Sequence, residues 1–291
     1  MSSNNPVFRN SDGFSKASYN AYGNPTYAGN GAAYPGYGKA PNDPSGWGVG
    51  GPGQPGYAPA AAGPRMTIDS TVQKTALSLL VVFVTAFATW ILTPDITAPN
   101  ADLSPLFAAA TIGSLGAFGL SLVNSFKRVV SPALVLLFAA FEGVALGGLS
   151  KVIDASFGGG IVIQAVIGTF AAFAGTLAAY KFFNIRVGNR FRKFVVAAMF
   201  GMVGLALFEM VLGMFGSGTG LFGFGALGIL TAVAGLVLGV FMLIMDFDFV
   251  EQGIANQLEE RESWRAAFAI TVSLVWIYTN LLRLLAIFQQ D

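Results

Sequence analysis

Residues 221–245 read LFGFGALGILTAVAGLVLGVFMLIM, an apolar stretch without a single charged residue. A helix of about 20 such residues crosses the ~30 Å hydrocarbon core of a bilayer, so this stretch predicts a transmembrane helix, with an extension to residue 256 left open. Six further apolar stretches of similar character lie at residues 75–93, 105–124, 130–150, 159–180, 194–214 and 264–288. The sequence therefore predicts an all-α membrane protein, a bundle of seven transmembrane helices formed by residues 66–291.

The composition agrees with a membrane protein and excludes several kinds of chemistry. Charged residues make up 11% of the chain, against about 25% in a typical soluble protein, and the mean hydropathy is +0.63. The chain has neither cysteine nor histidine, which removes thiol nucleophiles, Ser-His catalysis and the commonest metal ligands. We therefore expect no enzymatic activity, no resident cofactor and no nucleic-acid partner. A retinal pigment is discounted because the last apolar stretch contains no lysine.

Residues 1–65 differ from the rest of the chain. They are rich in glycine, proline, tyrosine and asparagine and show no helical or strand periodicity. Such a segment buries too little apolar surface to offset the entropy of ordering it, so we predict a disordered cytoplasmic tail. The alternative is a tail that docks a cytoplasmic protein partner or associates weakly with itself.

The distribution of basic residues predicts the orientation of the helices. Cations gather in the tail and in every second connection: Arg9, Lys16, Lys39, Arg65, Lys74, Lys127, Arg128, Lys181, Arg186, Arg190, Arg192, Lys193, Arg261 and Arg265. The alternate connections carry only Lys151. Because cytoplasmic loops of membrane proteins carry the excess of lysine and arginine, we expect a multi-pass protein of the cell membrane with its N-terminus in the cytoplasm and its C-terminus outside.

Two glycine pairs predict close contacts between helices. Gly143 and Gly147 are four residues apart, as are Gly235 and Gly239. Each pair lies on one helix face, where the backbones of two helices can approach closely. We therefore expect both pairs to be contacts inside the bundle.

Five charged residues fall inside or at the edge of the apolar stretches: Glu142, Glu209, Asp246, Asp248 and Arg283. A carboxylate at bilayer depth costs about 2.5–3.5 kcal/mol, so each one needs a partner, a proton or water. Counted from the cytoplasmic ends at 1.5 Å per residue, Glu142 lies roughly 18 Å and Glu209 roughly 22 Å into its helix, near the middle. Asp246 and Asp248 approach the cytoplasmic end of theirs.

Each of these charges has a structural and a functional interpretation. Glu142 and Glu209 can be hydrogen-bond partners between helices, and Asp248 can be a solvated residue at the interface. Arg283 either reaches the outer interface or serves as a latch or ion-pair partner of an acid. Asp246 follows a long apolar run and is the strongest functional candidate, because desolvation disfavours the charged form of a carboxyl group and makes it proton-sensitive. When ionised, it can bind a cation.

Four segments carry a resemblance to a known family. They are residues 5–11 (NPVFRNS), 141–147 (FEGVALG), 245–253 (MDFDFVEQG) and 262–268 (ESWRAAF), the last leading to LRLL at 282–285. With these segments the chain resembles the Bax inhibitor-1-like family, also called the transmembrane Bax inhibitor motif family, in its actinobacterial form. The resemblance covers about residues 66–291 and the first dozen residues.

The resemblance implies a seven-helix bundle with the last helix at its centre and a pH-sensitive calcium leak across the membrane. It places one proton-sensing acid at Asp246 and a second at the position of Asn280, where this chain has an amide. The arginine latch of the family's second helix is unmatched, with only Lys127 and Arg128 at that helix end. Either Glu142, Glu209 or Asp248 completes the sensor, or the activity is altered. Asp246 and Asn280 come closer in depth if the helix continues to residue 256.

Two functions follow as expectations. The first is a pH-sensitive cation leak channel, with calcium as the permeant ion and Asp246 as its oxygen ligand, because hard cations prefer oxygen ligands. The second is a regulatory membrane protein that binds or modulates membrane proteases or stress-response partners without transport. Ion flux through the purified protein in liposomes separates them.

Overall fold

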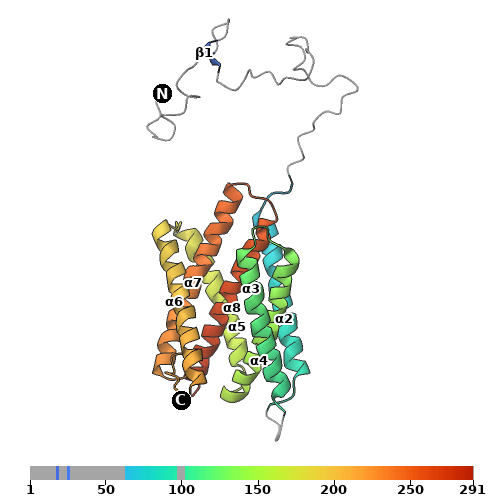
Figure 1. Ribbon diagram of the computed structural model, residues 1–291, viewed down its shortest axis with the longest axis vertical. Helices are drawn as coiled ribbons and strands as arrows, with labels where there is room; N and C mark the ends of the chain where they lie inside the picture. The colour runs from blue at the N-terminus through green and yellow to red at the C-terminus, as the bar shows by residue number, and fades with distance from the viewer. Residues whose placement is uncertain (1–17, 20–24, 27–62, 97–101, 291) are drawn as a thin grey trace. The chain divides into compact units, whose positions relative to one another are not determined.

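The computed structural model describes residues 18–19, 25–26, 63–96 and 102–290. Within these residues the chain forms seven long helices (Figure 1): α2 Ile68–Leu92, α3 Ser104–Phe126, α4 Pro132–Phe157, α5 Ile161–Phe182, α6 Asn189–Met214, α7 Ala226–Ala255 and α8 Glu262–Phe288. All seven are long and apolar enough to cross a membrane. The predicted all-α membrane fold with seven spans is confirmed.

The chain divides into two compact units, Met1–Ala60 and Ala61–Asp291. In the first unit the strands β1 (Ser18–Tyr19) and β2 (Pro25–Thr26) pair antiparallel, with Ser18 opposite Thr26 and Tyr19 opposite Pro25. Most of the tail predicted to be disordered, residues 1–65, lies outside the described residues. The second unit contains all seven helices.

Several helices extend beyond their apolar stretches, most notably α2 and α7. α2 begins at Ile68 rather than at residue 75, because Thr67 caps it: the Thr67 side chain accepts a hydrogen bond from the Ser70 backbone N–H, and the Ser70 side chain accepts one from Thr67. Such a reciprocal cap stabilises polar first turns that carry no apolar signal. α7 continues past Asp246 to Ala255. The extension that was left open from the sequence is therefore present.

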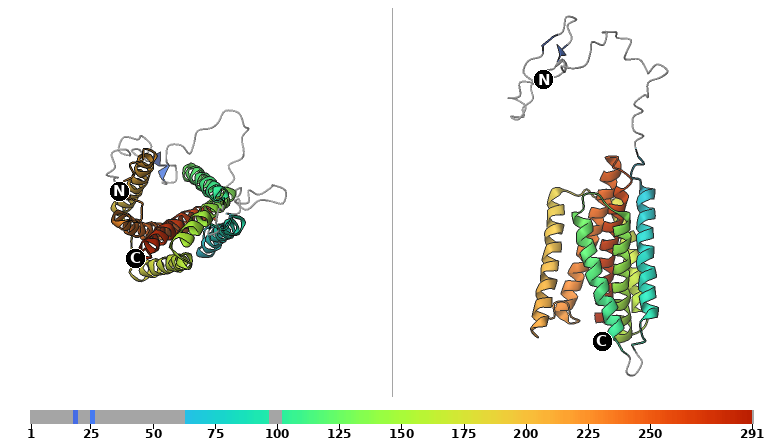
Figure 2. Two further views of the ribbon diagram at one scale, coloured as in Figure 1. Left: turned by 90° about the horizontal axis from the view of Figure 1, so that it is seen from below. Right: turned by 45° about the vertical axis from the view of Figure 1, so that its right-hand side comes forward.

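Helix α8 is the centre of the bundle. It packs against α2, α4, α5 and α7, whereas α3 packs chiefly on α4 and α6 on α7. Seen along the bundle (Figure 2, left), α8 in red lies among its neighbours, and α3 and α6 lie at the periphery. The central last helix implied by the family resemblance is confirmed.

A close approach between helices involves the first glycine pair. A Cβ atom placed on Gly143 would overlap the Thr85 hydroxyl and the Val82 carbonyl oxygen of α2, and one on Gly147 would overlap the Ala86 carbonyl oxygen. Because glycine has no side chain, α4 can lie directly against the α2 backbone at these two positions. Gly235 and Gly239 likewise face Asn280 and Ile277 of α8. Both glycine pairs are helix contacts, as predicted.

We expect Gly143→Ala to destabilise the bundle by about 1–3 kcal/mol, because overpacking against rigid backbone forces two helices apart. The measurement is the thermal unfolding midpoint of the purified protein in detergent. The matched control is Gly119→Ala on α3, where a Cβ meets no other atom within 4 Å. The control should leave the midpoint unchanged or raise it slightly. Equal midpoints for both variants would contradict the close packing of α2 and α4.

The segment before α2 is joined to the turn between α7 and α8. The Glu260 backbone N–H donates to the Pro64 carbonyl oxygen, and the Met66 N–H donates to the Leu258 carbonyl oxygen, both at 2.8 Å. Arg65 forms an isolated antiparallel bridge with Glu259. A salt bridge of 2.7 Å from Lys74 to Glu260 adds a second link. Pro64 and Arg65 thus belong to the helical unit, although the predicted tail runs to residue 65.

Candidate functional site

The antiparallel pair of α7 and α8 determines which polar residues meet. The connection between them is short, so residues at equal distances from the turn lie side by side. Gly235 faces Asn280, and Gly239 faces Ile277. Closer to the turn, the Ser273 hydroxyl lies 2.5 Å from a carboxylate oxygen of Asp246. The partner of Asp246 on α8 is therefore Ser273.

Asp246 is half-buried on α7, between the helices rather than in the connection. Ser273, its partner, is only 1% exposed. Within the described residues, Ser273 is the sole hydrogen-bonding partner of the Asp246 carboxylate. A hydrogen bond to a charged acceptor contributes about 1.5–3 kcal/mol. The hydrogen bond between Ser273 and Asp246 therefore contributes to the contact between α7 and α8.

Asp248 lies near Asp246 but has a different environment. Its side chain is 9% exposed and accepts from Arg192 of α6 at 3.1 Å and from Gln252 at 2.7 Å. The expectation of a solvated interfacial residue is therefore wrong: the long guanidinium side chain reaches from α6 and shields the acid. Nearby, the Tyr180 hydroxyl of α5 donates to Glu251 at 2.6 Å. The end of α7 is thus tied to both α5 and α6.

Asn280 does not meet Asp246. Its side-chain amide donates to the Trp276 carbonyl oxygen at 2.8 Å, and its carbonyl oxygen packs against Gly235. Seven residues separate it from Ser273, which is roughly 10 Å along a helix. The implied pairing of positions 246 and 280 is therefore wrong for this chain, even though α7 extends to Ala255.

Arg283 lies one turn beyond Asn280 and contacts no acid among the described residues. Its Nη2 group donates to the Thr231 hydroxyl at 3.2 Å and to the Asn280 side-chain oxygen at 3.5 Å. The guanidinium lies over the Phe222 ring at 5.1 Å from its centroid. Its buried Nε group has no hydrogen-bond partner. The structure thus places Arg283 against the connection between α6 and α7 rather than in an ion pair.

Glu209 lies near the end of α6, whereas Glu142 lies near the middle of α4. Glu209 lies in the last turns of α6, where it accepts from the Thr219 hydroxyl at 2.5 Å and from the Gly220 N–H at 2.7 Å. The expected mid-membrane depth of Glu209 is therefore wrong, and its carboxylate instead holds the connection that follows α6. Glu142 is half-buried on α4 and has no hydrogen-bond partner within the described residues.

The described residues offer no preformed cage for a metal ion. They contain no group of three or more histidine, cysteine, aspartate or glutamate side chains placed to hold one. Calcium takes six to eight oxygen ligands, so a calcium ion at Asp246 would need water and carbonyl oxygens for most of its shell.

Seven apolar helices around a central α8, with carboxylates between the helices near one end, define a polytopic helical membrane protein with membrane-embedded protonatable groups. Over residues 5–290 the chain matches the family described as Bax inhibitor 1 like, and it belongs to that family. A comparison with curated proteins found no match to the chain.

Proposed function

We propose that this protein is a pH-sensitive cation leak of the cell membrane, with calcium as the favoured ion. The observation that carries the proposal is Asp246, a half-buried carboxylate between two membrane helices whose single described partner is the Ser273 hydroxyl. Membership of the Bax inhibitor 1 like family supports the same function.

The proposed mechanism couples a proton to the contact between α7 and α8. Ionised Asp246 accepts a charge-assisted hydrogen bond from Ser273, and it offers a hard oxygen ligand to a cation. Protonation removes the charge, weakens the hydrogen bond and removes the attraction for the cation. Asp248 is neutralised by Arg192 and is not free to replace it. Asp246 is therefore the acid through which pH acts.

The test is calcium flux into liposomes that contain only the purified full-length protein. We expect flux above that of empty liposomes, with a different rate at acidic and at mildly alkaline pH. Potassium flux measured in parallel compares the two cations. Protein-containing liposomes that are as tight as empty ones at every pH would refute the leak.

We propose further that the end of the bundle bearing the α7–α8 turn faces the cytoplasm. The support is the excess of basic residues at that end, including Arg128, Arg186 and Arg261. Because the chain has no cysteine, one cysteine placed at position 186 reports its side by labelling with a membrane-impermeant reagent. Labelling of Arg186→Cys in intact cells would contradict this orientation.

The second candidate function is regulation of partner proteins without transport. The observation that favours it is the bridge between the segment at Arg65 and the α7–α8 turn at Glu259. A partner that binds the chain ahead of Arg65 would act on the two helices that carry Asp246 and Ser273. Tight liposomes together with a partner captured by the full-length protein would favour this candidate over the leak.

A further inference from the structure

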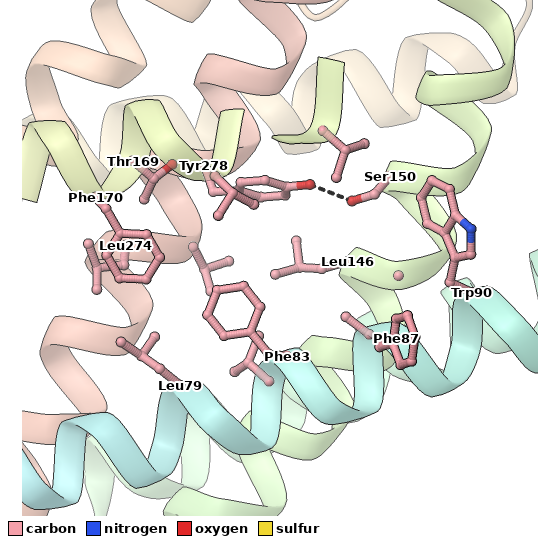
Figure 3. A pocket seen from close by; sticks show the side chains of 16 residues that line it. Leu79, Phe83, Phe87, Trp90, Leu146, Ser150, Thr169, Phe170, Leu274 and Tyr278 are labelled. Carbon is pink, nitrogen blue, oxygen red and sulfur yellow. Dashed lines mark hydrogen bonds between the residues drawn. The ribbon is translucent and has the colours of Figure 1, made fainter. Parts of the chain in front are cut away.

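A second feature of the bundle lies away from the carboxylates. A cavity of about 220 Å³ lies among α2, α4, α5 and α8. Figure 3 shows its walls: Phe83 and Trp90 from α2, Leu146 from α4, Phe170 from α5, and Leu274 and Tyr278 from α8. Nearly all of this lining is apolar. The cavity plays no part in the contacts of Asp246.

Two of the helices that line the cavity, α2 and α5, leave a gap between them. These two helices each pack on α8 but do not pack closely on each other. The rings of Phe83 and Phe170 stack across the gap, with centroids 6.1 Å apart. Both rings are less than half exposed, at 43% and 44%. They form a partial aromatic barrier between the cavity and the outside of the bundle.

The surface around this gap is the one that faces lipid. On α2 it continues through Phe87, and on α5 through Ile163 and Ile167, all exposed apolar side chains on membrane-spanning helices. The gap between α2 and α5 therefore faces the hydrocarbon phase.

Each hydroxyl group in the wall has a hydrogen-bond partner within the protein. The Ser150 hydroxyl and the Tyr278 hydroxyl hydrogen-bond to each other at 2.6 Å (Figure 3). The Thr169 hydroxyl donates to the Ala165 carbonyl oxygen of its own helix at 2.7 Å. Because each of these hydroxyl groups has a partner inside the protein and the rest of the lining is apolar, the cavity suits a hydrocarbon chain.

One end of the cavity lies at Trp90, in the last turn of α2. Trp90 lines both this cavity and a second, more polar one that includes Thr93, Lys151 and Asp154. Tryptophan is typical of the membrane interface, where its ring is half apolar and half polar. From Leu79 to Trp90 the wall extends eleven residues, roughly 16 Å along α2. The cavity is therefore elongated along the helices, with a polar neighbour at one end only.

We propose that this cavity binds one acyl chain of a membrane phospholipid, whose headgroup lies beside Trp90. The three N–H donors of the nearby Lys151 ammonium are already used inside the protein, by the carbonyl oxygens of Trp90 and Thr93, both at 2.7 Å, and by the Thr93 hydroxyl at 3.1 Å. The chain leaves one apolar phase for another, so packing against the cavity wall, rather than the hydrophobic effect, provides the affinity. Bound in this way, the chain fills the space between α2 and the central helix.

The direct test uses a phosphatidylcholine with a photoreactive diazirine in one acyl chain. The full-length protein is reconstituted with this lipid, irradiated and digested, and the labelled residues are found by mass spectrometry. Leu274 and Tyr278 are 4% and 9% exposed on the central helix, out of reach of lipid on the outer surface. We expect label on one or both of them. Label confined to exposed residues such as Ile163 would overturn the proposal.

A pair of neighbouring variants locates the site. Val166 lines the cavity, whereas Ile167, the next residue of α5, is 63% exposed to the outside. Val166→Phe fills the cavity and should reduce the labelling of α8 at least about fivefold. Ile167→Phe adds a ring on the outer surface and should leave it unchanged. Equal labelling of α8 in both variants would place the chain elsewhere.

Whether the bound acyl chain belongs to a phospholipid or to a free fatty acid is tested with the unlabelled protein. Native mass spectrometry of the wild-type protein released from mild detergent should show one retained phospholipid per protein molecule. The Ile167→Phe variant should retain the same phospholipid. A protein that retains a free fatty acid, or only detergent, would overturn the phospholipid assignment. The photolabelling uses the wild-type protein, so it tests the proposal even when a variant fails to fold.

Discussion

In Asp246→Asn, calcium flux in liposomes is expected to become independent of pH and to equal the wild-type flux at acidic pH. Asparagine has the shape of a protonated aspartate and cannot ionise, so the variant is held in the protonated state. The Asn side-chain oxygen still accepts from Ser273, but a charge-assisted hydrogen bond of about 1.5–3 kcal/mol becomes a neutral one of about 0.5–1.5 kcal/mol. The difference of about 1–1.5 kcal/mol changes an equilibrium between two arrangements of α7 and α8 by roughly fivefold to tenfold. The wild-type flux should differ between the two pH values by a comparable factor.

The control for this experiment is Asp69→Asn. Asp69 is an exposed acid in the first turn of α2, at the same end of the bundle as the α7–α8 turn. Its neutralisation changes the surface charge by the same amount and should leave the pH profile unchanged. A wild-type pH profile in Asp246→Asn would place the proton sensor elsewhere, with half-buried Glu142 as the next candidate.

The second large effect is expected from Ser273→Asp, which places a carboxyl group opposite Asp246. Two acids at this distance cannot both ionise easily, and they titrate as a coupled pair. The variant should show a new or steeper pH transition of cation flux. Asn280→Asp should not, because position 280 lies roughly 10 Å farther along α8. Instead it gives Arg283 a carboxylate partner and should raise the thermal unfolding midpoint.

Ser273→Asp both adds a carboxyl group and removes a hydroxyl group, and Ser273→Ala shows the effect of removing the hydroxyl group alone. It removes the hydrogen bond to Asp246 without adding a charge, so it should alter the flux level and add no second transition. A steeper pH transition in Asn280→Asp than in Ser273→Asp would show that Asp246 and Asn280 are neighbours, in conflict with the register of α7 and α8.

The spans were predictable because each carries enough apolar residues to cross hydrocarbon, and the basic connections are local sequence features. The depth of Glu209 was not. Counting from the start of an apolar stretch assumes that the stretch fills the membrane, but α6 begins earlier, at Asn189, and its last turns carry Glu209. The side chain then turns back to Thr219 and Gly220, a contact that depends on the fold of the connection.

The partner of Asp246 could not be predicted from the sequence either. Which residues of α7 and α8 face each other depends on where α7 ends and how tight the turn is, and a shift of one helical turn changes every pair. Ser273 is a small polar residue in an apolar stretch, a weak signal shared by other serines and threonines there. Arg192 stood among several basic residues, and only the packing of α6 on α7 selects it as the partner of Asp248.

The link between the chain at Pro64 and the α7–α8 turn has a mechanical consequence. A pull on the polypeptide ahead of Pro64 is not absorbed by α2 alone, because the backbone hydrogen bonds from Glu260 and Met66 transmit the load to the turn. This turn connects α7 to α8, so a force applied to it acts on both helices. Tension applied there would reach the hairpin in which Asp246 of α7 meets Ser273 of α8.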